Sequence, residues 1–115
     1  MNLLESKMVD AIKKSTSVDL GNTRVEVFGQ TVKVYLFNRL IADIDYTYML
    51  DPVCELDGRL IVSTDKGFMT SVKVSRLNAI LGAFGKPKIV TWRYAYCFED
   101  THFTDNDRTF YGLER

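Results

Sequence analysis

Residues 67–98 read GFMTSVKVSRLNAILGAFGKPKIVTWRYAYCF, and this stretch decides the fold of the chain. Thr70 and Ser71 offer hydroxyl groups to the free amides of a first helical turn. Gly85 suits the left-handed position after a helix, and Pro87 prevents the helix from continuing. An amphipathic helix is therefore predicted between these two signals. Its apolar stripe consists of Val74, Leu77, Ile80, Leu81 and Phe84.

A strand is predicted directly after this helix, over residues 89–98. Successive side chains of a strand point to opposite faces, so one face of this strand is mostly aromatic. That face consists of Val90, Trp92, Tyr94, Tyr96 and Phe98. Residues 99–108 are expected to form an acidic loop, and residues 109–113 a last short strand.

The chain upstream of the stretch begins with a helical pattern. Apolar residues recur at helical spacing over residues 2–16. Glu5 lies near the start of this segment and Lys13 and Lys14 near its end, as the helix dipole favours. An N-terminal helix is therefore predicted.

From Thr23 onward, apolar and polar residues alternate, which is typical of half-buried strands. Alternating runs on both sides of Gly29-Gln30 predict a β-hairpin, and a third strand is expected over residues 40–48. Asp57-Gly58 has the composition of a tight turn, so a further hairpin is expected with strands over residues 53–56 and 59–63.

These patterns predict an α+β fold. It consists of an N-terminal helix, an antiparallel five- to six-stranded meander sheet, and one amphipathic helix packed on a sheet face. At 115 residues the chain is expected to be one domain over residues 1–115. Residues 1–20 are expected to hold the N-terminal helix and a turn, and residues 22–115 the sheet together with helix 71–84.

The composition excludes several classes of protein. Fifteen basic residues balance fifteen acidic ones, so the chain as a whole has no electrostatic attraction to nucleic acid or to anionic membranes. No apolar run approaches the roughly 18 residues of a membrane span, and the first residues lack the features of a signal peptide. Cys54 and Cys97 are far apart in apolar segments, and reduced, packed thiols are favoured over a disulfide.

Two segments resemble a pattern in small uncharacterised proteins of tailed bacteriophages. They are VKVYLFNRLIADI at residues 32–44 and GFMTSVKVSRLNAIL at residues 67–81. The second contains the G-[WF]-x-T element, with Phe68 and Thr70, and the R-L-N-A-[IL]-L run that begins at Arg76. The resemblance covers about residues 32–98 and implies a phage protein located in the host cytoplasm. It implies no particular activity, because the pattern has no known shared function.

Arg76 and Asn78 lie in the most specific part of this pattern and are candidate binding residues. An arginine can clamp a carboxylate or a phosphate, and Asn78 can hold a loop carbonyl. A structural role is favoured. In that role Arg76 packs over an aromatic ring and pairs with an acidic loop, while Asn78 ties the helix to the sheet.

The aromatic strand supplies a second set of candidate binding residues. They are Trp92, Arg93, Tyr94 and Tyr96, with Lys86 and Lys88 nearby. Exposed rings stack on the bases of single strands, and cations follow the phosphates. Only one strand shows this pattern and the net charge is zero, so a place in the core or in an interface is favoured over nucleic-acid binding.

No catalytic residue, metal ligand or cofactor site is predicted. Cys97 and His102 lack the second ligand pair that structural zinc requires. Asp105-Asn106-Asp107 lacks the glycine and the final glutamate of a calcium loop. Gly-rich phosphate loops and nucleophile elbows are also missing from the sequence. The protein is therefore not expected to be an enzyme.

A binding protein is the favoured class. We expect a phage accessory protein that binds a host protein of defence or transcription, or another copy of itself. Weak binding of single-stranded nucleic acid is the alternative. Aromatic side chains bury much area at little entropic cost, so a homo-oligomer with aromatic residues from 92 to 111 in its interface is also expected.

Overall fold

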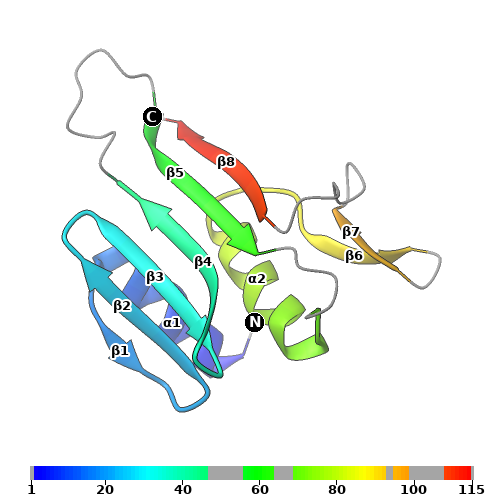
Figure 1. The fold of residues 1–115 in the computed structure, drawn as a ribbon, viewed down its shortest axis with the longest axis horizontal. Helices are drawn as coiled ribbons and strands as arrows, with labels where there is room; N and C mark the ends of the chain where they lie inside the picture. The colour runs from blue at the N-terminus through cyan, green and yellow to red at the C-terminus, as the bar shows by residue number, and fades with distance from the viewer. Residues whose placement is uncertain (1, 47–55, 64–68, 93–94, 99–107, 115) are drawn as a thin grey trace.

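The computed structural model describes residues 2–46, 56–63, 69–92, 95–98 and 108–114 (Figure 1). These residues form two helices and eight strands. The elements are α1 (Leu3–Lys14), β1 (Val18–Asp19), β2 (Thr23–Phe28), β3 (Thr31–Leu36), β4 (Arg39–Asp45), β5 (Leu56–Ser63), α2 (Ser71–Ala83), β6 (Ile89–Trp92), β7 (Ala95–Phe98) and β8 (Arg108–Glu114).

Six of the strands form one antiparallel sheet in the order β1-β2-β3-β4-β5-β8. Strands β1 to β5 are neighbours in chain order, as in a meander. Strand β8 returns to pair with β5 after α2 and the two-stranded β6–β7 sheet. The predicted α+β fold is confirmed, with its N-terminal helix, its antiparallel sheet and its second helix.

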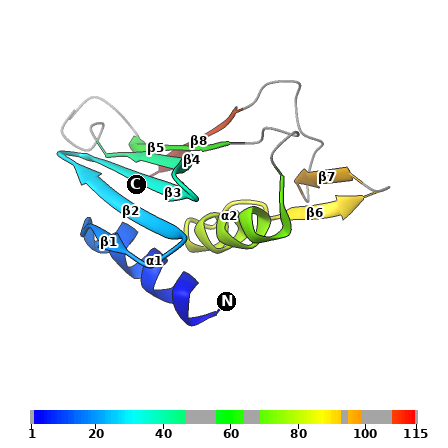
Figure 2. The ribbon, with the colours of Figure 1, turned by 60° about the horizontal axis from the view of Figure 1, so that its bottom comes forward.

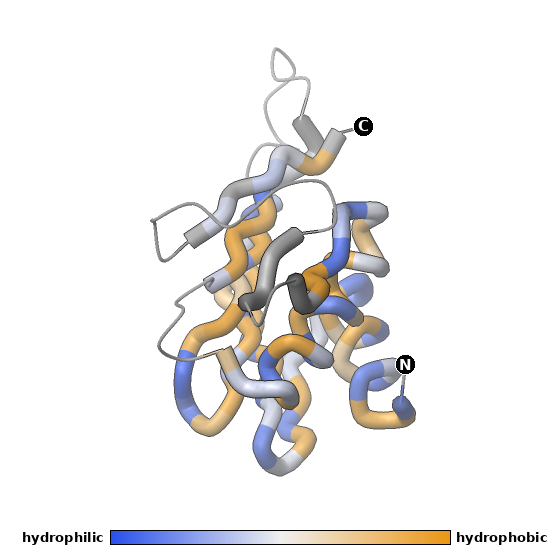
Figure 3. Tube along the Cα trace, turned by 90° about the vertical axis from the view of Figure 1, so that its right-hand side faces the viewer, coloured by the Kyte–Doolittle hydropathy of each residue, from blue (hydrophilic) through white to orange (hydrophobic). Residues whose placement is uncertain are grey.

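Both helices lie on the same side of the six-stranded sheet, which we call the covered face (Figure 2). Hydrophobic and hydrophilic residues alternate along the chain (Figure 3), and the apolar ones meet between the helices and the covered face. The fully buried core includes Met8, Ile12, Val25, Val34, Ile44, Leu60, Leu77 and Ile80. The predicted apolar stripe of α2 therefore packs against the sheet.

The capping residues explain where the two helices begin. The Asn2 side chain accepts a hydrogen bond of 2.8 Å from the backbone amide of Glu5, and the Thr70 hydroxyl accepts one of 3.2 Å from the amide of Lys73. Gly85 follows α2 with a φ of 68°, the left-handed conformation predicted for it.

The prediction of a hairpin turn at Asp57-Gly58 is wrong. Both residues lie inside β5, which runs from Leu56 to Ser63. Gly58 is needed there because a Cβ atom would lie 2.7 Å from the backbone oxygen of Asp45 on β4. The glycine thus marks a close approach of two strands, next to a register shift between Leu56 and Gly58. Residues 53–55 of the predicted first strand lie outside the described residues.

The prediction of a single strand over residues 89–98 is also wrong. The segment forms β6 and β7, which pair antiparallel with Ile89 opposite Phe98 and Trp92 opposite Ala95. These two strands form a separate two-stranded sheet and do not join the six-stranded one. Ile89 is buried, while Val90, expected on the inward aromatic face, is 38% exposed.

Candidate functional site

Arg76 is a buried residue that connects three elements. It is 7% exposed. Its Nη1 donates a hydrogen bond of 2.9 Å to Oε2 of Glu5 on α1, and its Nε donates one of 3.0 Å to the hydroxyl of Thr23 on β2. Sequence analysis favoured a structural role with an aromatic ring and an acidic loop as partners. The structure instead gives Arg76 a partner in the N-terminal helix.

Glu5 is the anionic centre of this buried cluster. Its Oε2 also accepts a hydrogen bond of 2.5 Å from the Ser75 hydroxyl. Burial alone raises the pKa of the Glu5 carboxyl, but the hydrogen bonds from Ser75 and Arg76 outweigh it and bring the pKa below its usual value of 4.5. The Glu5 carboxylate therefore stays charged inside the protein. Its hydrogen bonds with Ser75 and Arg76 connect α1 to α2.

Asn78 fixes the position of the β6–β7 hairpin. Its Nδ2 donates a hydrogen bond of 3.0 Å to the carbonyl of Ile89, and its Oδ1 accepts one of 2.6 Å from the amide of the same residue. One side chain thus satisfies both backbone groups at the first position of β6. These contacts are those of the structural alternative, in which Asn78 ties the helix to a strand.

Two of the four aromatic-strand candidates belong to the β6–β7 hairpin. The structure describes the backbone of Trp92 on β6 and of Tyr96 on β7, which are not directly opposite each other in the register. Arg93 and Tyr94 lie outside the described residues. The hairpin projects beside α2 and away from the six-stranded sheet (Figure 1). The described backbone of Trp92 and Tyr96 thus lies on this hairpin, whereas Arg76 on α2 is bonded to Glu5 of α1 and Thr23 of β2.

The second side of the six-stranded sheet has neither α1 nor α2 over it and was not among the predicted sites. We call this side the open face (Figure 2). Its residues alternate along the strands with those of the core. They are Arg24, Glu26, Phe28, Thr31, Lys33, Tyr35, Leu40, Asp43, Asp45, Arg59 and Ile61. The sequence does contain a signal for this face. Successive side chains of a strand point to opposite faces, so the polar positions of each alternating strand belong to the side opposite the core.

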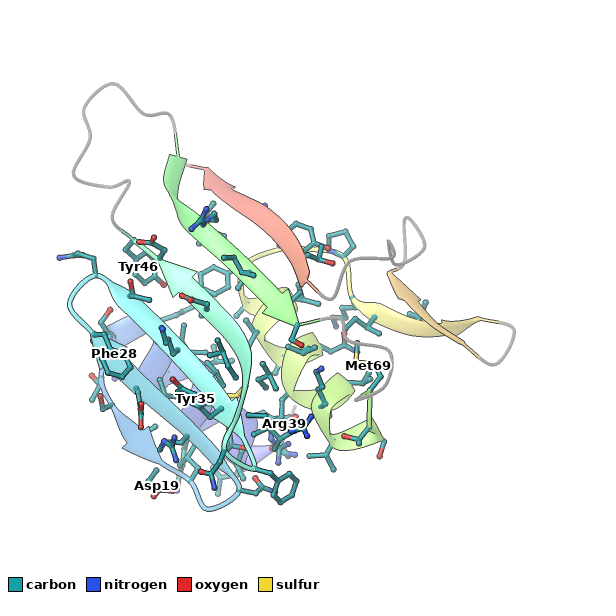
Figure 4. All side chains as sticks on the ribbon, in the orientation of Figure 1. Asp19, Phe28, Tyr35, Arg39, Tyr46 and Met69 are labelled. Atoms are coloured by element: carbon teal, nitrogen blue, oxygen red, sulfur yellow. The ribbon has the colours of Figure 1, made fainter. Side chains whose placement is uncertain are left out.

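Charged groups on the open face are paired with aromatic rings and with one another. The Arg24 guanidinium lies 4.7 Å from the centre of the Tyr35 ring and 2.6 Å from the carboxylate of Glu26. The Lys33 ammonium lies 5.7 Å from the centre of the Phe28 ring. Figure 4 shows Phe28 and Tyr35 on this part of the sheet.

The charges of the open face are balanced. Arg24, Lys33 and Arg59 are positive, and Glu26, Asp43 and Asp45 are negative. Asp45 and Arg59 are directly opposite each other on β4 and β5, with 4.0 Å between their charged atoms. A face with both signs interspersed and with aromatic rings suits a protein partner better than a phosphate backbone, which requires positive charge throughout.

A cavity of about 390 Å³ lies at the other end of the core, where the two helices end. It is lined by Lys13, Ser15, Gln30, Tyr46 and Phe84. The Lys13 ammonium lies 5.9 Å from the centre of the Phe84 ring, and burial raises the pKa of the Tyr46 hydroxyl.

The described residues also bear on two other kinds of site, a metal site and a membrane span. Within the described part of the chain, no group of three or more His, Cys, Asp or Glu residues could hold a metal ion. His102 and the acidic loop lie outside that part. Neither α1 nor α2 is long and apolar enough to cross a membrane.

Comparison with known proteins gives a family assignment. The family model described as Kyanoviridae Gp96 protein matches residues 1–113, which is nearly the whole chain. No curated protein matches the chain, and no solved structure matches it either.

Proposed function

The chain belongs to the Kyanoviridae Gp96 protein family, a family of phage proteins, and we propose that it is an accessory protein that acts by binding a host protein in the host cytoplasm. The surface proposed for this binding is the open face. The proposed binding involves no catalytic step and no cofactor.

The observation that carries the proposal is the composition of the open face. Phe28 is 53% exposed and Leu40 is 40% exposed, so the face offers apolar contact area between its charged groups. The charged side chains hold one another in place before a partner arrives, as the Arg24–Glu26 and Arg24–Tyr35 contacts show. A preorganised surface loses less entropy on binding and therefore retains more of its contact energy.

Arg76 and Asn78 are engaged in contacts inside the protein, which supports the open face as the binding surface. Arg76 is neutralised by Glu5 inside the protein, so its guanidinium is not available to an external phosphate or carboxylate. Asn78 uses both ends of its amide on Ile89. A binding role for either residue would require the contacts between α2 and its neighbours to break.

Capture of partners from host lysate tests the proposal, with and without nuclease. We expect the wild-type protein to retain a host protein, identified by mass spectrometry, that is retained after nuclease treatment. The double variant Phe28→Ser and Lys33→Glu, which alters the open face, should lose it. The variant Lys7→Glu, with the same charge reversal on an exposed position of α1, should keep it.

Two results would contradict the proposal. Equal capture by the wild-type protein and the open-face variant would remove the open face as the binding surface. Loss of all capture after nuclease treatment would favour the alternative, binding of single-stranded nucleic acid through the β6–β7 hairpin, which carries Trp92 and Tyr96.

A further inference from the structure

Phe37 occupies a position that the fold itself does not explain. It is the first of the two residues in the turn between β3 and β4, and it has a φ of 50°. Two-residue turns with positive φ at both positions favour asparagine and glycine, and a bulky aromatic residue in this conformation is strained. The Phe37 side chain is 64% exposed, so packing within the chain offsets little of this strain.

The turn that carries Phe37 is held in place by hydrogen bonds. The Phe37 amide donates one of 2.8 Å to the carbonyl of Asn22. The side-chain oxygen of Asn38 accepts one of 2.9 Å from Nη1 of Arg24. Strained residues that their surroundings hold in this way are found mainly where a protein contacts something else. An exposed ring on a fixed support also loses little entropy on binding, so Phe37 has the properties of an anchor.

The cavity of about 390 Å³ lies at the opposite end of the same two strands. Gln30 precedes β3 and Tyr46 follows β4, whereas Phe37 lies between these strands at their other end (Figure 1). The Tyr46 amide donates a hydrogen bond of 2.8 Å to the carbonyl of Gln30, which connects the two residues at the cavity. Strand β3 has six residues, so roughly 20 Å separate its two ends. Phe37 therefore cannot reach the cavity of its own chain.

The described lining of this cavity suits a phenyl ring. It includes Phe84 and Tyr46, and aromatic rings pack favourably against one another edge to face or offset. The Lys13 ammonium lies at the same cavity, 5.9 Å from the centre of the Phe84 ring, and attracts the face of an aromatic ring. Benzene fits a protein cavity of about 150 Å³. A volume of about 390 Å³ therefore has room for a ring and for part of the turn that carries it.

We propose that Phe37 of one copy of this chain inserts into this cavity of a second copy. Because the ring and the cavity lie at opposite ends of β3, each copy donates its ring to one neighbour and receives a ring from another. Such head-to-tail contacts build an open filament, or a closed ring where the rotation between copies allows it. This self-association does not depend on the proposed binding of a host protein. The homo-oligomer expected from the sequence had aromatic residues from 92 to 111 in its interface, whereas this one uses Phe37, Tyr46 and Phe84.

Mass measurement by sedimentation or light scattering, over a series of micromolar concentrations, tests the proposal. We expect the wild-type protein to grow beyond a dimer as its concentration rises. Phe37→Asn removes the ring and introduces a residue that tolerates positive φ, so the turn is kept. This variant should raise the dissociation constant by roughly tenfold or more, because an aromatic anchor in a pocket carries much of the contact energy.

Gln30→Trp tests the cavity in the same measurement. Gln30 is exposed and lines the cavity, so an indole ring at this position fills the cavity from its own chain and should also prevent growth. Lys13→Trp blocks the same cavity from α1 and replaces Gln30→Trp if that variant does not fold. The control is Val72→Ser, which removes an exposed apolar side chain of α2 and should assemble as the wild-type protein does. Thermal unfolding of each variant verifies that it is folded.

A mixture of the two variants distinguishes head-to-tail contacts from other kinds of association. Gln30→Trp retains the Phe37 ring and Phe37→Asn retains the open cavity, so an equal mixture should form a dimer of one copy each and nothing larger. A wild-type protein that stays monomeric at all concentrations, or that stops at a dimer, would overturn the proposal. So would an assembly that Phe37→Asn leaves unchanged, or a mixture that stays monomeric while the wild-type protein assembles.

Discussion

The guanidinium of Arg76 and the carboxylate of Glu5 are 71 positions apart in the sequence and form one buried ion pair. Burying a charge costs several kcal/mol, and the partner and the surrounding hydrogen bonds offset that cost. Removing one partner therefore leaves the other charge buried without compensation.

We expect Arg76→Ala to lower the free energy of unfolding by about 3–5 kcal/mol, measured by denaturant unfolding. The control is Lys14→Ala, which removes an exposed ion pair with Asp10 four residues earlier and should change stability by less than about 0.5 kcal/mol. Similar unfolding midpoints for the two variants would show that the Glu5–Arg76 pair does not stabilise the fold.

The same carboxylate makes stability depend on pH. The pKa of Glu5 is lower in the folded protein than its usual value of 4.5, so between the two values the unfolded chain binds more protons. The contribution of Glu5 to the free energy of unfolding should therefore be complete above about pH 5. It should decrease as the pH falls from about 5 toward the folded pKa. Glu5→Gln should flatten this part of the stability curve in urea unfolding at several pH values. An unchanged slope in Glu5→Gln would assign the acid sensitivity to other carboxyl groups.

At the residue scale, sequence reasoning succeeded where the signal was local. The caps at Thr70 and Gly85 each act within one helical turn, so the spacing along the chain was sufficient to place them. The partner of Arg76 could not be predicted in this way, because Glu5 and Thr23 come from two distant elements. Spacing along one helix says nothing about which other elements will pack beside it.

At the scale of elements, two glycines lie in different surroundings, so replacing each with alanine is expected to change stability in opposite directions. Gly58 lies in β5, where a Cβ atom would meet the backbone oxygen of Asp45 at 2.7 Å. Gly82 lies near the end of α2, where a Cβ atom would meet only the flexible end of Lys88 at 3.4 Å.

We expect Gly58→Ala to destabilise the protein by about 1–3 kcal/mol, because two backbones must move apart. Gly82→Ala should stabilise it by about 0.5–1 kcal/mol, since alanine loses less conformational freedom than glycine in a helix. Thermal or denaturant unfolding of both variants measures the difference. If Gly58→Ala is as stable as the wild-type protein, then β4 and β5 do not approach as closely as described.

Turn signals were the least reliable guide to the elements. Asp57-Gly58 has the ideal composition for a hairpin turn, yet the glycine serves a close contact between β4 and β5. The same residue type meets both requirements, so composition could not separate them. Similarly, alternation over residues 89–98 did not reveal the break between β6 and β7. Each strand alternates with a period of two, but Trp92 pairs with Ala95, so the faces shift by one residue between the two strands.

At the scale of the whole molecule, the alternation of apolar and polar residues was enough for the class of fold and for the antiparallel sheet. Alternation could not show that both helices lie on the same face of the sheet. That arrangement depends on the contacts of α1 with α2 around Glu5 and Arg76. The open face as a candidate surface follows from that choice, and so it became visible only in three dimensions.

The fold is also expected to be independent of metal ions. Core packing and the buried ion pair hold the described elements together, and the described residues contain no metal-binding cluster. A chelator should leave the melting temperature unchanged in differential scanning calorimetry. A marked decrease would reveal a metal ion that contributes to folding.

The distance in sequence between Glu5 and Arg76 has a consequence for the order in which the protein folds during synthesis. A ribosome adds about 5–20 residues per second, so roughly 4–14 s pass between the two residues. Strands β2, β3 and β4 pair with their immediate neighbours in the chain and can assemble in that interval. The Glu5 carboxylate of α1, by contrast, cannot form its ion pair until Arg76 has been synthesised. We expect α1, which precedes the other described elements in the chain, to be among the last to dock. Stalled chains that end before α2 should therefore be cut by protease within residues 3–14, and chains that include α2 should be protected there.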